Sequence, residues 1–156
     1  MSTASPGIRD FTSDQLARMA RLFAHDVDVT LATGRAGTER QRRQLTKNSH
    51  LEVWLMTWPS GATTDWHDHG AAAGAAAGAM VVVQGELIDR LWKGGSEHWR
   101  DLRAGDEIAI SPRTAHNLTN VGDDVAITIH AYAPGLAEMT PYAWENGQPV
   151  AIDAAS

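Results

Sequence analysis

The feature that most constrains this fold is a series of short segments with period-two hydrophobicity, beginning at Leu51. In the first segment Leu51, Val53 and Leu55 alternate with other side chains, which is typical of a strand that packs on a core. The later strand-like runs are Met80–Gln84, Glu86–Trp92, Glu97–Leu102, Glu107–Ile110 and Val125–Tyr132. Turn signals separate these runs, namely Pro59–Gly61, Gly85, Gly94–Gly95, Gly105–Asp106, Ser111–Pro112 and Gly122–Asp123. Many short strands between turns predict a mainly β protein, folded as one sandwich or barrel.

The segment before these strands has a different pattern. A helix is expected over Ser13–Ala24, where Leu16, Met19, Ala20 and Phe23 share one helical face and Thr12 or Ser13 can cap the start. The charged stretch Thr38–Lys47 is a candidate for a second short helix. We expect a flexible N-terminus over residues 1–10, one domain over 11–145 and a C-terminal tail over 146–156.

Composition excludes several classes of function. The net charge of −6, without a basic stripe, argues against a nucleic-acid surface. The chain has no cysteine, which rules out disulfides, thiolate metal ligands and a cysteine nucleophile. No apolar run approaches the ~20 residues of a membrane span, and no signal peptide is evident. We therefore expect a cytoplasmic protein, monomeric or homodimeric, that acts on a small molecule.

Three of the seven histidines form a candidate metal site. His67 and His69 are two residues apart, so on a strand both imidazoles point to the same face while Asp68 points away. His116 can complete the set from a later strand. No Asp or Glu lies between Gly70 and Gly85, so we expect an all-histidine site. Imidazole suits iron, nickel, manganese and zinc, and spacing does not choose among them.

At this point the chain resembles the cysteine dioxygenase family of cupins. The stretches that carry the resemblance are Trp58–Gly61 with Thr64–His69, Val81–Leu87, Gly105–Asn120 and Thr128–Pro134. Together with an upstream arginine they span about residues 40–135. The first and the last stretch are fairly specific to thiol dioxygenases, and the other two are general cupin features. The resemblance implies a single cupin (jelly-roll-type) β-barrel with one or two N-terminal helices.

The same resemblance implies an activity, namely oxidation of a small thiol to a sulfinate by both atoms of dioxygen at a mononuclear Fe(II) site, with Ni(II) as the alternative metal. His67, His69 and His116 match the metal ligands of the family. Tyr132 matches its active-site tyrosine, and His130 and Thr128 match the residues that hydrogen-bond to that tyrosine. Threonine at position 128 keeps the hydroxyl of the more usual serine.

An arginine upstream of the first strand binds the substrate carboxylate in cysteine-using relatives. Arg43 is the best match, because Leu45 follows it with the expected spacing. The loop after it differs in length, so Arg42 stays an alternative.

The chain departs from the family pattern in two places. A cysteine–tyrosine crosslink is impossible without cysteine, and Gly74 or Gly78 would stand in its place. The segment Gly70–Ala79 also looks about four residues longer than the family pattern, which bears on the shape of the pocket. L-Cysteine is the first substrate to try. A 3-mercaptopropionate-like thiol, a different sulfur-oxidised product of a biosynthetic pathway and a non-catalytic ligand-binding cupin are the alternatives.

Overall fold

The computed structural model describes residues 11–69, 77–111, 114–133 and 140–152. Two helices precede the strands, α1 (Ser13–His25) and α2 (Val29–Arg35). The strands are β1 (Gln41–Lys47), β2 (Glu52–Trp58), β3 (His67–Asp68), β4 (Ala77–Gln84), β5 (Glu86–Lys93), β6 (Ser96–Arg103), β7 (Glu107–Ile110), β8 (His116–Thr119), β9 (Ala126–Ala133), β10 (Thr140–Glu145) and β11 (Gln148–Ala151). No helix in the described ranges is long and apolar enough to cross a membrane.

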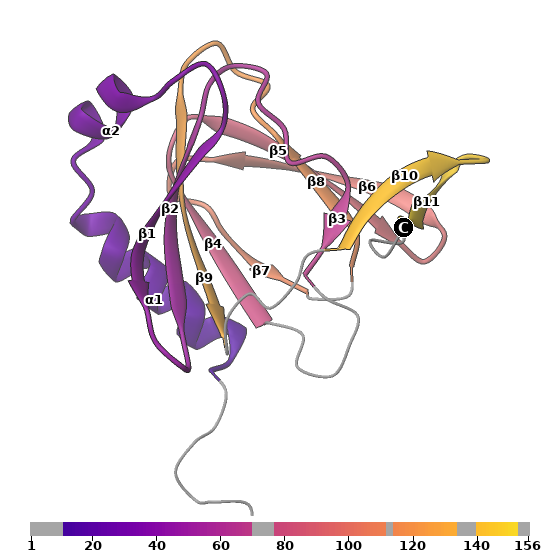
Figure 1. The fold of residues 1–156 in the computed structure, drawn as a ribbon, viewed down its shortest axis with the longest axis horizontal. Coiled ribbons are helices and arrows are strands. Elements are labelled where there is room, and N and C mark those ends of the chain that lie inside the picture. The colour runs from indigo at the N-terminus through magenta and orange to yellow at the C-terminus, as the bar shows by residue number, and fades with distance from the viewer. Residues whose placement is uncertain (1–10, 70–76, 112–113, 134–139, 153–156) are drawn as a thin grey trace, which may run out of the picture.

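The strands form two antiparallel sheets that face each other (Figure 1). The five-stranded sheet has the order β1-β2-β9-β4-β7, and the six-stranded sheet has the order β11-β10-β3-β8-β5-β6. Neighbours in both sheets are mostly far apart in sequence, as β2 and β9 are. This long-range pairing joins the first and last parts of the chain into one barrel-like body. The expected mainly β architecture is therefore confirmed.

The central strands of the five-stranded sheet, β2, β9 and β4, are buried on both faces. The inner face of this sheet contributes to the core between the sheets, which contains Met56, Trp58, Met80, Val82, Leu87, Leu102, Ile110, Leu118, Ala126 and Tyr132. Its outer face packs against the apolar stripe of α1, where Leu16 and Ala20 are fully buried against Val53 and Ile129. Figure 1 shows α1 lying along this outer face. Because inner and outer side chains alternate along each strand, the register of the sheet is fixed by two cores at once.

The helix expected over Ser13–Ala24 is confirmed as α1, and Thr12 caps it through a capping box with Gln15. The candidate helix over Thr38–Lys47 is wrong, because β1 occupies most of that stretch and pairs with β2. The second helix is instead α2, capped by Asp28. Charged residues are common on exposed edge strands, so the polarity of β1 hid its pairing from a reading of the sequence.

The C-terminal strands were also missed. Strand β10 pairs with β3, and β11 continues the six-stranded sheet to its edge within the expected tail. Figure 1 shows this β10–β11 hairpin on the side of the molecule opposite the helices.

Candidate metal centre and active site

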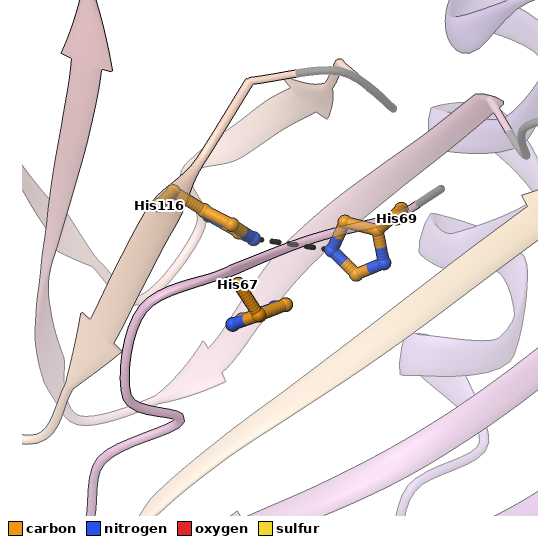
Figure 2. A group of neighbouring side chains, drawn as sticks. All are labelled: His67, His69 and His116. Carbon is orange, nitrogen blue, oxygen red and sulfur yellow. Dashed lines mark hydrogen bonds between the residues drawn. The ribbon is translucent and has the colours of Figure 1, made fainter. Parts of the chain in front are cut away.

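The three histidines predicted as ligands come together in the six-stranded sheet. His67 on β3 is the direct cross-strand partner of His116 on β8, and His69 follows β3 by one residue. Each is at most 5% exposed. One ring nitrogen from each residue lies within 4.8 Å of the others, and the Nε2 atoms of His69 and His116 are 3.1 Å apart (Figure 2). Three converging imidazole nitrogens are a donor set that could hold one metal ion.

A backbone carbonyl orients the first of these imidazoles. The Nδ1 atom of His67 lies 3.0 Å from the carbonyl oxygen of Asp65, so this nitrogen carries the proton and Nε2 is left as the electron-pair donor. Asp65 has a φ of 58°, which is uncommon for a residue other than glycine. The strained turn thus aims a carbonyl at the imidazole and fixes its tautomer.

A carboxylate orients the second imidazole. Asp89 on β5 is fully buried and accepts a hydrogen bond from His116 Nδ1 at 2.9 Å. Arg100 on β6 holds the other oxygen of Asp89 at 2.6 Å. Burial raises the pKa of Asp89, but the hydrogen bonds and charges of His116 and Arg100 outweigh it and bring the pKa below its usual range. Such carboxylate–histidine pairs fix the tautomer of metal-binding imidazoles.

Asp89 was missed in the sequence, although a signal was present. In the run Glu86–Trp92, Leu87 and Leu91 alternate inward, and Asp89 stands between them at an inward position. A charged residue at a core-facing strand position requires a partner, which marks it as part of a buried network.

Burial keeps two of the imidazoles neutral. It lowers the pKa of His67 to about 4 and that of His69 to about 2, and the neighbouring His116 adds to both shifts. Neutral imidazole is the form that binds a metal ion, so these two side chains can bind a cation without first losing a proton. His25, His50 and His98, to which no site was assigned, are exposed.

The three residues predicted to support the chemistry lie together on the inner face of β9. Thr128, His130 and Tyr132 alternate inward and are at most 2% exposed. Thr128 Oγ1 lies 2.8 Å from His130 Nε2, and His130 Nδ1 lies 3.1 Å from the hydroxyl of Tyr132. The Tyr132 ring lies 5.1 Å from the His69 ring, centroid to centroid. The hydrogen-bonded chain therefore ends beside the three histidines.

A buried tryptophan begins this chain of hydrogen bonds. Trp58 Nε1–H donates to Thr128 Oγ1 at 2.9 Å, since an indole nitrogen only donates. Burial lowers the pKa of His130 to about 3, so its ring is neutral and carries one proton. In the tautomer with that proton on Nδ1, the Thr128 hydroxyl donates to Nε2 and the Nδ1–H donates to the Tyr132 oxygen. The hydroxyl hydrogen of Tyr132 then points toward another acceptor.

Tyr132 itself is held as the neutral phenol. Burial raises its pKa above the usual value, although the nearby Arg40 and Arg42 oppose the shift. Gly78 on β4 is its cross-strand neighbour, and a Cβ at Gly78 would lie 2.8 Å from the Tyr132 ring. Gly78, one of the two glycines that the sequence left open at this position, is thus in contact with the tyrosine, and the other, Gly74, lies outside the described residues.

A cavity of about 70 Å³ joins the two groups of residues. It is lined by His67, His69 and His116, by His130 and Tyr132, and by Arg40 and Arg42 among others. Arg43 does not reach it. Arg43 lines a separate, larger cavity of about 600 Å³ between the helices and strands β1 and β2, where Arg42 is also a lining residue and none of the three histidines is.

The expectation that Arg43 binds the substrate carboxylate gains no support from this cavity, of which Arg43 is not a lining residue. Arg42, the alternative from the sequence, lines the cavity of the histidines, and so does Arg40, which sequence reasoning passed over. The unequal loop lengths hid this arrangement, whereas the register of β1 on β2 fixes it, with Arg42 opposite Met56.

The C-terminal hairpin supports the histidine pair from the other side of β3. Pro141 is the cross-strand partner of His67, and the Tyr142 hydroxyl donates to Asp68 at 2.5 Å. Burial and Asp68 together raise the pKa of Tyr142 to about 12. Trp144 packs edge-on against Trp66. Strand β3 is two residues long, so β8 and β10 together determine where its side chains lie.

Several solved structures share this fold. An oxalate oxidase in complex with the substrate analogue glycolate is 19% identical and matches with a TM-score of 0.56, over 67% of this chain and 56% of that chain. The chain therefore spans little more than half the length of that enzyme. A conserved protein with a double-stranded β-helix domain from Klebsiella pneumoniae subsp. pneumoniae is 21% identical, with a TM-score of 0.58 over 72% of this chain and 92% of its own. A Bacillus halodurans protein is 22% identical, with a TM-score of 0.57 over 79% and 85%. These likenesses confirm the predicted cupin fold.

The family of the chain is shown by a match to a family model, not by the structural likenesses. The model of the family described as cysteine dioxygenase type I matches residues 35–145, well over half of the chain. That range contains the three histidines, the β9 chain and both arginines of the cavity. The three histidines in that range could together hold a metal ion. The chain belongs to the cysteine dioxygenase type I family.

Proposed function

We propose that this protein is a thiol dioxygenase, which oxidises a small carboxylate-bearing thiol to a sulfinate with both atoms of dioxygen. L-Cysteine is the first substrate to test, and 3-mercaptopropionate is the alternative. The observation that carries the proposal is the hydrogen-bonded chain Trp58–Thr128–His130–Tyr132, which ends beside the histidine cluster. A metal site alone would suit many cupins, whereas a buried phenol held by a neutral histidine beside that site suits chemistry on an oxygen-containing group.

His67, His69 and His116 would hold the metal ion, for which we propose Fe(II), with Ni(II) as the alternative. When bound, a divalent ion would lower the pKa of a substrate thiol and supply the redox chemistry that activates dioxygen. The three imidazoles are neutral donors, so the charge of the ion is not reduced by its protein ligands. Asp89 holds the His116 ring in the donor orientation throughout.

The residues of the five-stranded sheet bind and orient the substrate. A guanidinium presents paired donors that match a carboxylate, and Arg40 and Arg42 both line the cavity. The Tyr132 hydroxyl donates a hydrogen bond toward an oxygen of the reacting group, with His130 fixing its orientation. The overall change is balanced without another reductant, since the sulfur loses four electrons and one dioxygen gains four.

The test is oxygen uptake by the Fe(II)-loaded protein, with L-cysteine and then with 3-mercaptopropionate, followed by mass spectrometry of the product. Uptake with a product two oxygens heavier supports the proposal. Uptake with a product of another mass would contradict the sulfinate as product, but it would still support oxidation of the thiol. Tight thiol binding without oxygen uptake would contradict the dioxygenase and favour a ligand-binding cupin.

A further inference from the structure

The cavity between the helices and strands β1 and β2 has no part in the proposed oxidation. Its volume is about 600 Å³, and Figure 1 shows both helices on the side of the molecule where these strands lie. Its apolar wall consists of Phe23, Val27, Leu31, Ala32, Leu45 and Leu55. None of these six residues is buried, and Leu31 is 45% exposed. A cavity of this size with an apolar wall is typical of a site for a small organic ligand.

The charged residues of this cavity are separated by sign. The cations are Arg35 at the end of α2 and Arg42 and Arg43 on β1, and the acids are Asp26 and Asp28 at the junction of α1 and α2. Asp28 is the N-cap of α2, where its side chain accepts a hydrogen bond from the helix backbone. The seven residues of α2 separate Asp28 from Arg35 by about 10 Å. Negative charge therefore lies at the helix junction, and positive charge at the end of α2 and on β1.

The three arginines are available to a ligand. All three are exposed, and none forms an ion pair with an acid in the described ranges. A free guanidinium presents a planar pair of donors that fits a carboxylate. Beside the apolar wall, these donors favour a ligand with one anionic group and an apolar chain. The two acids repel a second anionic group at the other end and so disfavour a dicarboxylate.

Arg42 connects this cavity with that of the histidines, because it is a lining residue of both. Its guanidinium lies over the Trp54 ring at 5.0 Å. Burial lowers the pKa of Arg40, and the charge of Arg42 adds to that shift, so the position of Arg42 affects the field in the histidine cavity. A ligand that binds Arg42 from the helix side would therefore change the positive charge that a substrate carboxylate meets.

We propose that the cavity at the helices is a second ligand site, which binds a medium-chain monocarboxylate and competes with the substrate for Arg42. The carboxylate lies on Arg42 and Arg43, and the alkyl chain lies along Phe23, Leu31 and Leu55. The site itself is independent of the proposed function, whereas the competition for Arg42 rests on it. By linkage, the bound monocarboxylate weakens substrate binding, and the substrate weakens binding of the monocarboxylate by the same factor.

The first experiment measures binding of octanoate to the metal-free protein by calorimetry, so that neither a metal ion nor turnover contributes. Octanoate should bind roughly tenfold or more tightly than butyrate, because its longer chain removes more apolar surface from water. It should exceed octylamine by a similar factor, because the arginines and not the acids receive the charged group. Equal affinity for butyrate, or tighter binding of octylamine, would overturn the site.

Variants place the ligand in this cavity. Ala32→Phe fills the space from α2 and should raise the Kd for octanoate by roughly tenfold, and Arg43→Gln should raise it by roughly five- to tenfold. Arg103→Gln is the matched control, since this exposed arginine on β6 lines neither cavity. Circular dichroism and the melting temperature of each variant establish that it is folded. Unchanged affinity in both Ala32→Phe and Arg43→Gln would overturn the site.

The competition for Arg42 is measured on the Fe(II)-loaded protein with the thiol that it oxidises best. Saturating octanoate should raise KM by roughly fivefold and leave kcat unchanged. In Arg42→Gln, KM is already raised, and octanoate should add little to it. Ala32→Phe separates this effect from octanoate that binds at the histidines. The increase in KM disappears in Ala32→Phe if octanoate acts from the helix side, and its persistence there would contradict the proposal.

The outcomes separate this inference from the proposed function. If octanoate does not bind the metal-free protein, the second site is wrong and the dioxygenase stands. If octanoate binds as expected but leaves KM unchanged, the site stands and the competition for Arg42 is wrong. If no thiol is oxidised, the dioxygenase is wrong, and the competition is then decided by the Kd of 3-mercaptopropionate for the Zn(II)-loaded protein with and without octanoate.

Discussion

The two sheets of this barrel contribute different chemistry to one cavity. The six-stranded sheet supplies His67 and His116, and His69 follows its strand β3. The five-stranded sheet, with the residue that leads into it, supplies Tyr132 with its hydrogen-bonded partners and the two arginines.

The supporting residues follow the same division. Asp89 and Tyr142 lie behind the histidines in the six-stranded sheet, whereas Trp58 and Gly78 lie beside the β9 residues in the five-stranded sheet. The proposed function thus assigns metal binding to one sheet and substrate binding to the other. Variants in one sheet should change metal content, and variants in the other should change turnover while the metal is kept.

The largest effect is expected from His116→Ala, which removes one of the three imidazoles. It also leaves the buried Asp89 without its histidine partner. We expect loss of nearly all bound metal and of all detectable oxidation, measured by elemental analysis and oxygen uptake. His98→Ala, at an exposed histidine, is the control. A His116→Ala protein with full metal content would contradict the three-histidine site.

Tyr132→Phe tests the other sheet. Removing the hydroxyl should lower kcat by roughly 100-fold or more, the range for a positioned proton donor, while metal content stays at the wild-type level. Steady-state oxygen uptake and metal analysis on the same preparation give both numbers. Unchanged turnover and an unchanged ratio of oxygen consumed to product would show that the hydroxyl has no such role.

Asp89→Asn separates metal affinity from chemistry. The amide is similar in size but cannot act as a charged acceptor for His116 Nδ1–H and Arg100. Loss of such a partner typically weakens metal binding about 10- to 100-fold, to be measured by competition with a chelator. With saturating metal, kcat should recover much of its value. A variant with normal metal affinity and low kcat would place Asp89 in the chemistry instead.

Gly78→Ala probes the contact between β4 and the tyrosine. The added methyl would lie within 3 Å of the Tyr132 ring and 3.2 Å from Ile110 Cβ, so the ring has to shift. Overpacking of this kind costs about 1–3 kcal/mol, visible as a lower melting temperature, and turnover should fall by roughly tenfold with metal retained. Gly34→Ala, where a Cβ meets nothing within 4 Å, is the matched control. An unaffected enzyme would show that Tyr132 has freedom to move.

The smallest effect is expected from Tyr142→Phe, which removes the hydrogen bond from β10 to Asp68. A hydrogen bond to a charged group contributes about 1.5–3 kcal/mol, part of which is lost because the Tyr142 side chain is incompletely buried. We expect a slightly lower free energy of unfolding in urea and a metal affinity reduced by a few fold. An effect as large as that of Asp89→Asn would mean that the C-terminal hairpin orients the ligands more strongly than β8 and β5 do.

Local patterns in the sequence were sufficient for much of this description. Alternating apolar residues predicted β2, β4, β5, β6, β7 and β9, because the period of side chains along a strand is a local property. The pair His67–His69, with His116, was recognisable for a similar reason, since two of the three lie on one strand face. Thr128, His130 and Tyr132 follow the same rule, and the structure brings them together.

Pairing between distant strands decided the rest. The polar strand β1 carries little apolar alternation, so nothing local showed that Arg40 and Arg42 line the histidine cavity and that Arg43 does not. Asp89 and Tyr142 are 27 and 74 residues from the side chains that they hold. Hydrogen bonds across such separations depend on the register and order of the strands. The sequence by itself thus determined which residue types can perform the chemistry, and the tertiary structure decided which of them meet, because contact between strands is set by both cores together.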